Sequence, residues 1–195
     1  LKAHRADVFA QTHKYVDVQA FLVHRLTGSY RTGWGSADPT GLFDIQNNCW
    51  AESLLAQIGI RLDQLPEVHP PGTIIGSLIP AAAEACGLPV GLPVVAGIGD
   101  GQASGLGVNI TSPGDAYLSM GTSVISGTFS DQYIFDPAFR TMTGGVPGSY
   151  LLETVQLGGG YIVAWFMEKI AGQPGQDVAN LQNFYDQAAS TVPPG

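Results

Sequence analysis

The sequence predicts an α/β protein, because two apolar strands each end in a turn that carries polar groups. The first strand, residues 93–96, is followed by two glycines and then by Asp100. The second, residues 116–120, ends in Gly121-Thr122-Ser123. Strand patterns alternate with helical patterns along the rest of the chain, as in α/β domains. Because open α/β sheets bind small ligands at the carboxyl ends of their strands, these two turns are the first candidates for a functional site.

Composition limits which classes of protein the sequence can belong to. The chain has 195 residues, which suffices for one domain or parts of two, and its 45% hydrophobic content supports a buried core. A net charge of −8 argues against a nucleic-acid partner, because phosphate contacts need clustered Lys and Arg. No apolar run approaches the ~20 residues of a membrane span. Cys49 and Cys86 are too isolated for a disulfide framework, which indicates a reduced, cytoplasmic compartment.

The first half is expected to contain short helices that end at glycines. Apolar residues at helical spacing predict a helix over residues 13–27, with Gly28 as its left-handed cap. The other expected elements are a strand over 29–34, a helix start over 36–40 with Ser36 or Asp38 as cap and Pro39 in the first turn, a helix over 50–58 closed by Gly59, an irregular connector over 65–72, a strand over 73–78, and a helix over 80–86 stopped by Gly87.

The second half is expected to begin at a domain boundary near residues 109–113, between the two core strands. The 26 glycines of the chain gather at turns, which predicts close approach of backbone to a ligand. The remaining expected elements are a strand over 124–129, a loop-rich stretch over 131–148, a strand over 151–156, a helix from the glycines 158–160 to 170, a helix over 178–189 and a connector over 191–195.

Asp100 has two compatible interpretations. A carboxylate directly after an apolar strand and two glycines suits a general base that must reach a substrate hydroxyl. The same residue can cap the helix that Gly101 would begin. The preceding Gly97-Ile98-Gly99 does not complete a dinucleotide fingerprint, because Gln102 stands at the third glycine position. A nicotinamide or flavin enzyme is therefore disfavoured.

Gly121-Thr122-Ser123 suits an anion such as phosphate, since small residues let amides and hydroxyls face it. A hairpin turn is the more common outcome for such a tripeptide alone. The glycines 158–160 likewise fit either a nucleotide at a helix start or a packing turn.

The remaining polar candidates favour structural roles. Asp38 and Asp44 fit caps and solvated loops better than a cleft. His13 and His24 are too far apart on one helix to share a metal ion and are expected at the surface.

Four stretches, taken together, carry a resemblance to a known family. They are KYVDVQAFLVHRLTG (14–28), SADPTGLFDI (36–45), GLPVVAGIGDGQASGLGV (91–108) and GDAYLSMGTS (114–123). In this order and spacing they resemble the middle of an FGGY-type carbohydrate kinase, nearest to xylulokinase-like members. The resemblance covers most of the chain.

The resemblance implies the actin-like (ribonuclease H-like) ATPase fold, with parts of two domains on either side of an ATP/sugar cleft. Residues 1–110 would be the C-terminal part of the sugar-binding N-terminal domain, and residues 111–195 the start of the ATP-binding C-terminal domain. Asp100 matches the family's base on the sugar hydroxyl. Gly121, Thr122 and Ser123 match the turn that faces the ATP phosphates.

The implied reaction is ATP-dependent phosphorylation of a ketose such as xylulose, or of a related polyol, with ATP and Mg²⁺ as cofactors. The sugar and ATP are the expected partners, without nucleic acid or membrane, and a homodimer is one option for assembly. Many members place Asn or Gln directly after the catalytic Asp to hold another substrate hydroxyl. Here that position is Gly101, so Gln102 is the candidate for this substrate contact.

The family's early DxGT-like turn, its N-terminal sugar pocket and its adenosine-binding segment are not in the sequence. We therefore expect a central fragment with negligible kinase activity by itself, in which no metal ligand is assigned. Three alternatives stay open: a kinase of the same family for glycerol, ribulose, fuculose or gluconate, a non-catalytic actin-like sugar- or nucleotide-binding protein, and an assembly scaffold. The acid after the GxG strand favours chemistry, because a sensor needs no base there.

Overall fold

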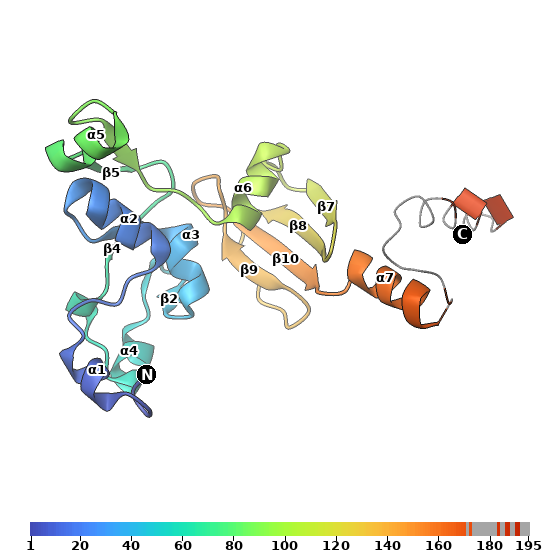
Figure 1. Ribbon diagram of the computed structural model, residues 1–195, viewed down its shortest axis with the longest axis horizontal. Coiled ribbons are helices and arrows are strands. Elements are labelled where there is room, and N and C mark those ends of the chain that lie inside the picture. Colours follow the sequence, from blue (N-terminus) through green and yellow to red (C-terminus); the bar gives the residue numbers. More distant parts are fainter. Residues whose placement is uncertain (171, 173–182, 184–185, 188–189, 192–195) are drawn as a thin grey trace. The chain divides into compact units, whose positions relative to one another are not determined.

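A computed structural model gives the structure of the chain, and it describes residues 1–170, 172, 183, 186–187 and 190–191 (Figure 1). The chain forms two units, each described by itself: residues 1–117 with 127–153, and residues 118–126 with 154–195. The expected domain boundary after residue 110 stays a prediction.

Short helices make up much of the first unit, and glycines end several of them. Gly28, Gly59 and Gly87 each adopt the left-handed conformation directly after a helix, with φ of 78°, 79° and 66°. The helices of this unit are α1 (Ala6–Gln11), α2 (Val18–Thr27), α3 (Trp34–Ala37), α4 (Glu52–Ile58), α5 (Pro80–Cys86) and α6 (Asp100–Gly107), with the 3₁₀ turns η1 (Asp38–Thr40) and η2 (Leu62–Gln64).

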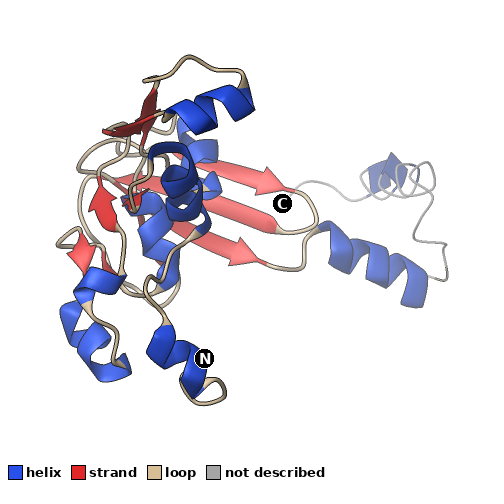
Figure 2. Ribbon diagram, turned by 60° about the vertical axis from the view of Figure 1, so that its left-hand side comes forward, coloured by secondary structure: helices blue, strands red, loops and turns tan. Residues whose placement is uncertain are grey.

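Three two-stranded ladders connect these helices (Figure 2). One is parallel and two are antiparallel. They pair β1 (Arg31–Gly33) with β4 (Glu67–His69), β2 (Phe43–Asp44) with β3 (Cys49–Trp50), and β5 (Ile74–Ser77) with β6 (Pro93–Val95).

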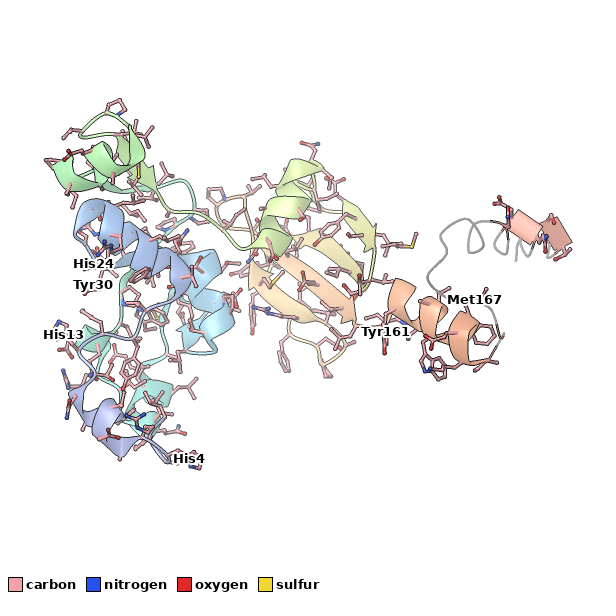
Figure 3. All side chains as sticks on the ribbon, in the orientation of Figure 1. His4, His13, His24, Tyr30, Tyr161 and Met167 are labelled. Carbon is pink, nitrogen blue, oxygen red and sulfur yellow. The ribbon has the colours of Figure 1, made fainter. Side chains whose placement is uncertain are left out.

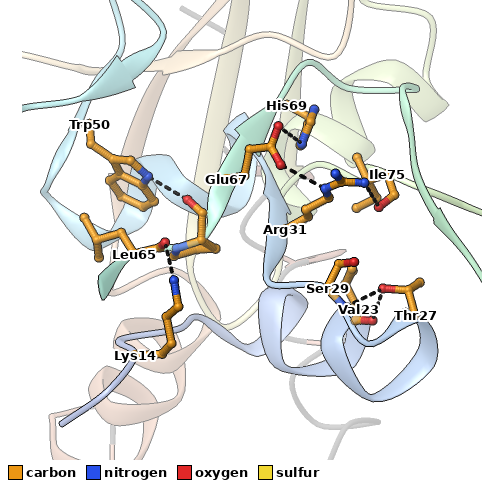
Figure 4. Close-up of polar contacts among 11 residues, drawn as sticks. Lys14, Val23, Thr27, Ser29, Arg31, Trp50, Leu65, Glu67, His69 and Ile75 are labelled. Atoms are coloured by element: carbon orange, nitrogen blue, oxygen red, sulfur yellow. Dashed lines mark hydrogen bonds and ion pairs between the residues drawn. The ribbon is translucent and has the colours of Figure 1, made fainter. Parts of the chain in front are cut away.

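Polar contacts tie these ladders together across long stretches of sequence (Figure 4). Arg31 Nε contacts Glu67 Oε2 at 2.9 Å, and its Nη1 donates to the Ile75 carbonyl at 3.1 Å. Trp50 Nε1 donates to the Pro66 carbonyl at 2.8 Å. The hydrogen bond to Arg31 is the main reason that the pKa of Glu67 lies below its ordinary value. One arginine on β1 therefore contacts both β4 and β5.

Two hydrophobic clusters fill the N-terminal part of the first unit. The smaller combines Val23 of α2 with Ile75 of β5 and Ala96 after β6. Ala96, which is 3% exposed, anchors the segment between β6 and Asp100 in this cluster. The larger contains Ala37, Phe43, Trp50, Leu55 and Leu65.

A four-stranded sheet follows α6 along the chain. Its order is β7 (Ala116–Met120), β8 (Val124–Ser130), β10 (Tyr150–Gln156) and β9 (Arg140–Thr143). Helix α6 lies against it (Figure 1): a Cβ placed on Gly105 would be 3.4 Å from Tyr117 Cε1 and 3.7 Å from Leu151 Cδ1. These are ordinary van der Waals distances, so α6 packs directly against the side chains of the sheet. In the second unit, α7 (Gly160–Lys169) buries Met167 (Figure 3).

Several predicted elements need correction. The helix predicted from residue 13 begins at Val18, because the Asp17 side chain accepts the Ala20 amide at 2.9 Å and caps it there. The predicted connector 65–72 contains β4, and the loop-rich stretch 131–148 contains β9. Ser36 and Asp38 are not N-caps, since α3 begins after Gly33 and η1 after Ala37, although Pro39 does lie in the first turn of η1. The predicted helix over 178–189 and the connector over 191–195 fall mostly outside the described residues.

Within the part of the chain that the structure describes, no helix is both long and apolar enough to cross a bilayer.

Candidate active site

Asp100 is the first residue of α6, and residues 96–99 separate it from the end of β6 at Val95. Gly99 is the N-cap residue, and it supplies no side-chain cap. The Asp100 side chain is exposed, and its Oδ1 accepts the amide of the neighbouring Gly101 at 2.9 Å. The carboxylate therefore stands at the helix start, where unpaired amides favour a negative charge, and stays accessible to a substrate. The predicted role of Asp100 as the helix cap is wrong, because Gly99 is the N-cap and Asp100 already belongs to the helix. Its role as a general base stays a prediction.

The turn before Asp100 is held by backbone packing against glycines from a distant segment. A Cβ on Gly33 would clash with the Gly97 carbonyl oxygen, and one on Gly35 would lie 3.0 Å from Gly99 N. The side chain of Gln19 completes the contact, because its Oε1 accepts the Gly33 amide at 2.6 Å. Sequence reasoning missed these residues. The only available signal was the Gly-Trp-Gly spacing, whose partner is a turn more than sixty residues later.

Gln102, the expected second substrate contact, is 4% exposed. Its Oε1 lies against Gly99, where a Cβ would collide with it. Its Nε2 is buried and has no hydrogen-bond partner in the structure. An unpaired buried amide donor costs roughly 1–3 kcal/mol, and a substrate hydroxyl that reached it would remove that cost. A substrate role for Gln102 stays a proposal on this ground.

Asp38 is not the solvated loop residue that its sequence context predicts. Its side chain is 3% exposed, and its Oδ1 contacts Arg140 Nη2 at 3.2 Å. Its Oδ2 accepts the Thr143 amide at 3.3 Å. Burial raises the pKa of Asp38, and Arg140 opposes that rise. Asp38 therefore joins η1 to β9. Asp44 does have the predicted loop role, because its Oδ1 accepts the Gln46 amide at 3.0 Å.

His24, expected at the surface, is half-buried. It stacks on Tyr30 with ring centroids 3.9 Å apart and an interplanar angle of 8° (Figure 3), and its Nδ1 is buried. His13 is exposed, as expected, and precedes α2. Among the described residues, no group of three or more His, Cys, Asp and Glu side chains could hold a metal ion.

The Gly121–Ser123 turn belongs to the second unit. Gly159 N donates to the Thr122 carbonyl at 2.9 Å, and Gly160 N donates to the Gly121 carbonyl at 2.8 Å. Two of the glycines 158–160 therefore have the packing role predicted as one of their two interpretations. The hydroxyl groups of Thr122 and Ser123 form no hydrogen bond with any described residue. They remain available to an anion.

Three open pockets lie in the first unit, away from Asp100. One of about 470 Å³ is lined by Lys14 and Trp50, and one of about 490 Å³ by His24 and Cys86. A third, of about 400 Å³, is lined by Asp38 and Arg140. None of these three includes Asp100 among its lining residues.

Comparison with known proteins decides the family. Residues 1–107 match the N-terminal domain of the FGGY family of carbohydrate kinases. The chain belongs to that family. Asp100 thus lies on the last helix of the matched part of this FGGY chain, whereas Gly121, Thr122 and Ser123 lie beyond it.

Relatives of this FGGY chain include kinases named for different substrates. The autoinducer-2 kinase of Escherichia coli strain K12 is 31% identical over 210 residues, which cover 100% of this chain and 38% of that protein. The solved xylulose kinase from Rhodospirillum rubrum has a TM-score of 0.90 and 27% identity over 100% of this chain and 39% of that chain. Gluconate kinase from Lactobacillus acidophilus has a TM-score of 0.86 and 27% identity over 99% of this chain and 38% of that chain.

These likenesses confirm the predicted fold. The FGGY chain has the mixed α/β, actin-like (ribonuclease H-like) fold of the solved sugar kinases. It spans 38% of the length of the curated relatives that it matches.

Proposed function

We propose that the protein carrying this chain transfers the γ-phosphoryl group of ATP to a hydroxyl of a sugar or polyol, with Asp100 as the general base. The observation that carries this proposal is an exposed carboxylate at the start of α6, on a turn that distant glycines hold by backbone packing. A general base must reach its proton without side-chain cover. Family membership supplies the reaction class.

In this reaction Asp100 accepts the proton of the attacking hydroxyl. The hydroxyl oxygen then forms a bond to the γ-phosphorus as the bond between that phosphorus and the bridging oxygen of ADP breaks. Positioning and electrostatics carry most of the catalysis in phosphoryl transfer. One role of this chain is therefore to hold the Asp100 carboxylate in place. Gln102, with its unpaired Nε2, is the proposed second contact to the sugar.

The residues of the Gly121–Ser123 turn suit the phosphates of ATP. Their hydroxyls are unpaired among the described residues, and small side chains leave the backbone accessible. Mg²⁺ is proposed with ATP, where it balances phosphate charge and is typically held by one or two carboxylates and the phosphates themselves. We assign no metal ligand in this chain.

The sugar is proposed as a class. A ketose such as xylulose is the first candidate, supported by the TM-score of 0.90 to a xylulose kinase. Autoinducer-2 is a second candidate, because the autoinducer-2 kinases match the whole chain at 31% identity. Gluconate and glycerol belong in the same test panel, since solved relatives are named for them.

The deciding experiment replaces Asp100 with Asn in the full-length protein and follows ADP release with each sugar of the panel. We expect kcat to fall by at least ~10²-fold, the usual low end for a lost general base. Asp131→Asn, at an exposed position, is the matched control and should keep normal turnover. Near-normal kcat in Asp100→Asn removes Asp100 from the role of base.

The same assay separates the alternatives. ATP hydrolysis that ignores every sugar would favour a non-catalytic sensor or an actin-like assembly protein. The isolated 195-residue chain is expected to show negligible turnover. A cytoplasmic location is proposed from the two free, exposed cysteines, Cys49 and Cys86.

A further inference from the structure

The side chain of Gln19, the second residue of α2, reaches two segments that lie far apart in the sequence. Its Oε1 accepts the Gly33 amide at 2.6 Å and the Thr32 hydroxyl at 3.3 Å. Its Nε2 lies against Gly97, because a Cβ placed on that glycine would be 2.7 Å from it. The Gln19 carboxamide is therefore held between the end of β1 and the turn that leads to Asp100.

The orientation of this carboxamide does not depend on the turn that it contacts. Asp17 caps α2 by accepting the Ala20 amide at 2.9 Å, which fixes the backbone that carries Gln19. Thr32, one of the two donors to Oε1, is fully buried. Only the oxygen of the carboxamide can accept these two hydrogen bonds, so they decide that the nitrogen faces Gly97. Gln19 is therefore a fixed support for the turn.

The contact with Gly97 is close enough along the chain to determine where Asp100 lies. Gly99 is the N-cap of α6, and Asp100 is its first residue. Among the described residues, the Asp100 carboxylate bonds only to the amide of the adjacent Gly101, at 2.9 Å. No distant side chain corrects its position, so the backbone of the turn sets it. A displacement at Gly97 is passed directly to the carboxylate.

We propose, on the basis of the proposed kinase function, that Gln19 is a positioning residue for Asp100: its carboxamide holds the Gly97 turn so that the carboxylate meets the sugar hydroxyl. Gln19 takes no part in the proton transfer itself. Positioning supplies much of the rate in such reactions, and a misplacement of about 1 Å can cost roughly 10²-fold. A residue of this kind affects turnover only through the group that it positions.

The first test measures kcat for Gln19→Met in the full-length protein, at a temperature where circular dichroism shows it folded. Methionine keeps the length of the side chain but loses the strong acceptor for the Gly33 amide. We expect kcat to fall about tenfold, with an unchanged KM for ATP. Gln11→Met, at an exposed position on α1, is the matched control and should keep wild-type kcat. An unchanged kcat in Gln19→Met overturns the proposal.

A double variant shows whether Gln19 acts through the carboxylate. Once Asp100→Asn has removed the base, the position of that side chain matters little. Adding Gln19→Met should then lower kcat by less than about twofold, because residues that act as a unit are not additive. A merely structural role would lower kcat by the same factor in both backgrounds, and that result overturns the proposal.

Thr32→Val covers the case in which Gln19→Met does not fold. It removes one of the two bonds to Gln19 Oε1 and leaves Gln19 itself in place. We expect kcat to fall in the same direction, by about twofold, and again only while Asp100 is present. An unchanged kcat in this variant would then overturn the proposal.

The last test needs no activity. The Gly101 amide donates to Asp100 Oδ1, so its NMR signal in protein labelled with ¹⁵N at glycine reports the place of the carboxylate. Gln19→Met should move this signal, which Gly101→Ala assigns, and Gln11→Met should leave it in place. A Gly101 signal that Gln19→Met leaves unmoved overturns the proposal. If the signal moves while Asp100→Asn keeps normal kcat, the positioning stands and the proposed function fails.

Discussion

Two glycine-containing turns follow strands β6 and β7 in this chain, and they are built differently. In the Gly97–Gly99 turn, glutamine side chains cover the glycines: a Cβ on Gly97 would lie 2.7 Å from Gln19 Nε2, and one on Gly99 would collide with Gln102. In the second turn, a Cβ on Gly121 would meet nothing closer than the Ser123 carbonyl oxygen at 4.0 Å. The first turn is closed over by side chains, whereas the second is open.

The two turns also differ from their packing partners in which glycines could not carry a Cβ. The motif glycines meet the flexible ends of side chains or open space. Their partners, distant in sequence, meet backbone: Gly33 would clash with the Gly97 carbonyl, and a Cβ on Gly159 would lie 2.9 Å from the Gly121 carbonyl oxygen. In each region the stricter requirement therefore lies outside the motif. A closed turn suits a fixed side chain such as Asp100, and an open one suits a bound anion.

The largest effect is expected from Gly33→Ala. Gly33 has extended backbone, with φ −85° and ψ 155°, which alanine adopts freely, so any cost comes from the clash with Gly97. Forcing a methyl group into close-packed structure costs about 1–3 kcal/mol. Amide hydrogen exchange at residues 97–100 should show this loss of local stability. Gly107→Ala, with no described atom within 4 Å, should not. Equal protection in both variants would contradict the backbone-packing account of this turn.

A smaller effect, about 1–2 kcal/mol, is expected from Gly159→Ala. The added methyl group would press on the Gly121 carbonyl oxygen and lie 3.0 Å from Val124 Cγ2. The matched variant is Gly121→Ala, which meets open space and should leave thermal unfolding unchanged. These two variants test whether Gly159, directly before α7, is the glycine that the Gly121–Ser123 turn requires. If Gly121→Ala destabilised the protein more than Gly159→Ala, the assignment of the required glycine would be wrong.

Elements with complete local signals were predictable from the sequence. The helix over 80–86 and the strand over 116–120 match the structure, because a proline at the helix start and Gly87 after its end mark the first, and turns bound the second. Strands β4 and β9 were missed. Each is short and is defined by a partner rather than by its own pattern: Arg31 pairs with Glu67, well beyond any local window.

In the candidate site, too, some residues could be predicted from their local sequence and others could not. Asp100 was predictable, since strand, glycines and acid are adjacent. Asp38 was not, because Asp-Pro-Thr has the local form of a helix start, while its partners Arg140 and Thr143 lie 102 and 105 residues later. The contact of Glu153 with Gly101 was likewise invisible, because it depends on which face of β10 meets α6.

The smallest effect on stability is expected from Gly101→Ala, in the first turn of α6. Gly101→Ala should keep the fold, because the atom in its way is the end of the flexible Glu153 side chain. Alanine also favours a helix over glycine by roughly 0.5–1 kcal/mol, which offsets the displacement. The methyl group must push the Glu153 carboxylate aside, however, away from its place against the first turn of α6.

When the carboxyl carbon of Glu153 is titrated by NMR, we expect Gly101→Ala to change the pKa of Glu153, while Gly107→Ala on the same helix leaves it in place. Both variants add one methyl group to α6 and change no charge, so helix propensity cannot account for a difference between them. If both variants gave the wild-type Glu153 titration, the carboxylate would not depend on the space above Gly101. The glycine after Asp100 would then reflect only the packing of α6.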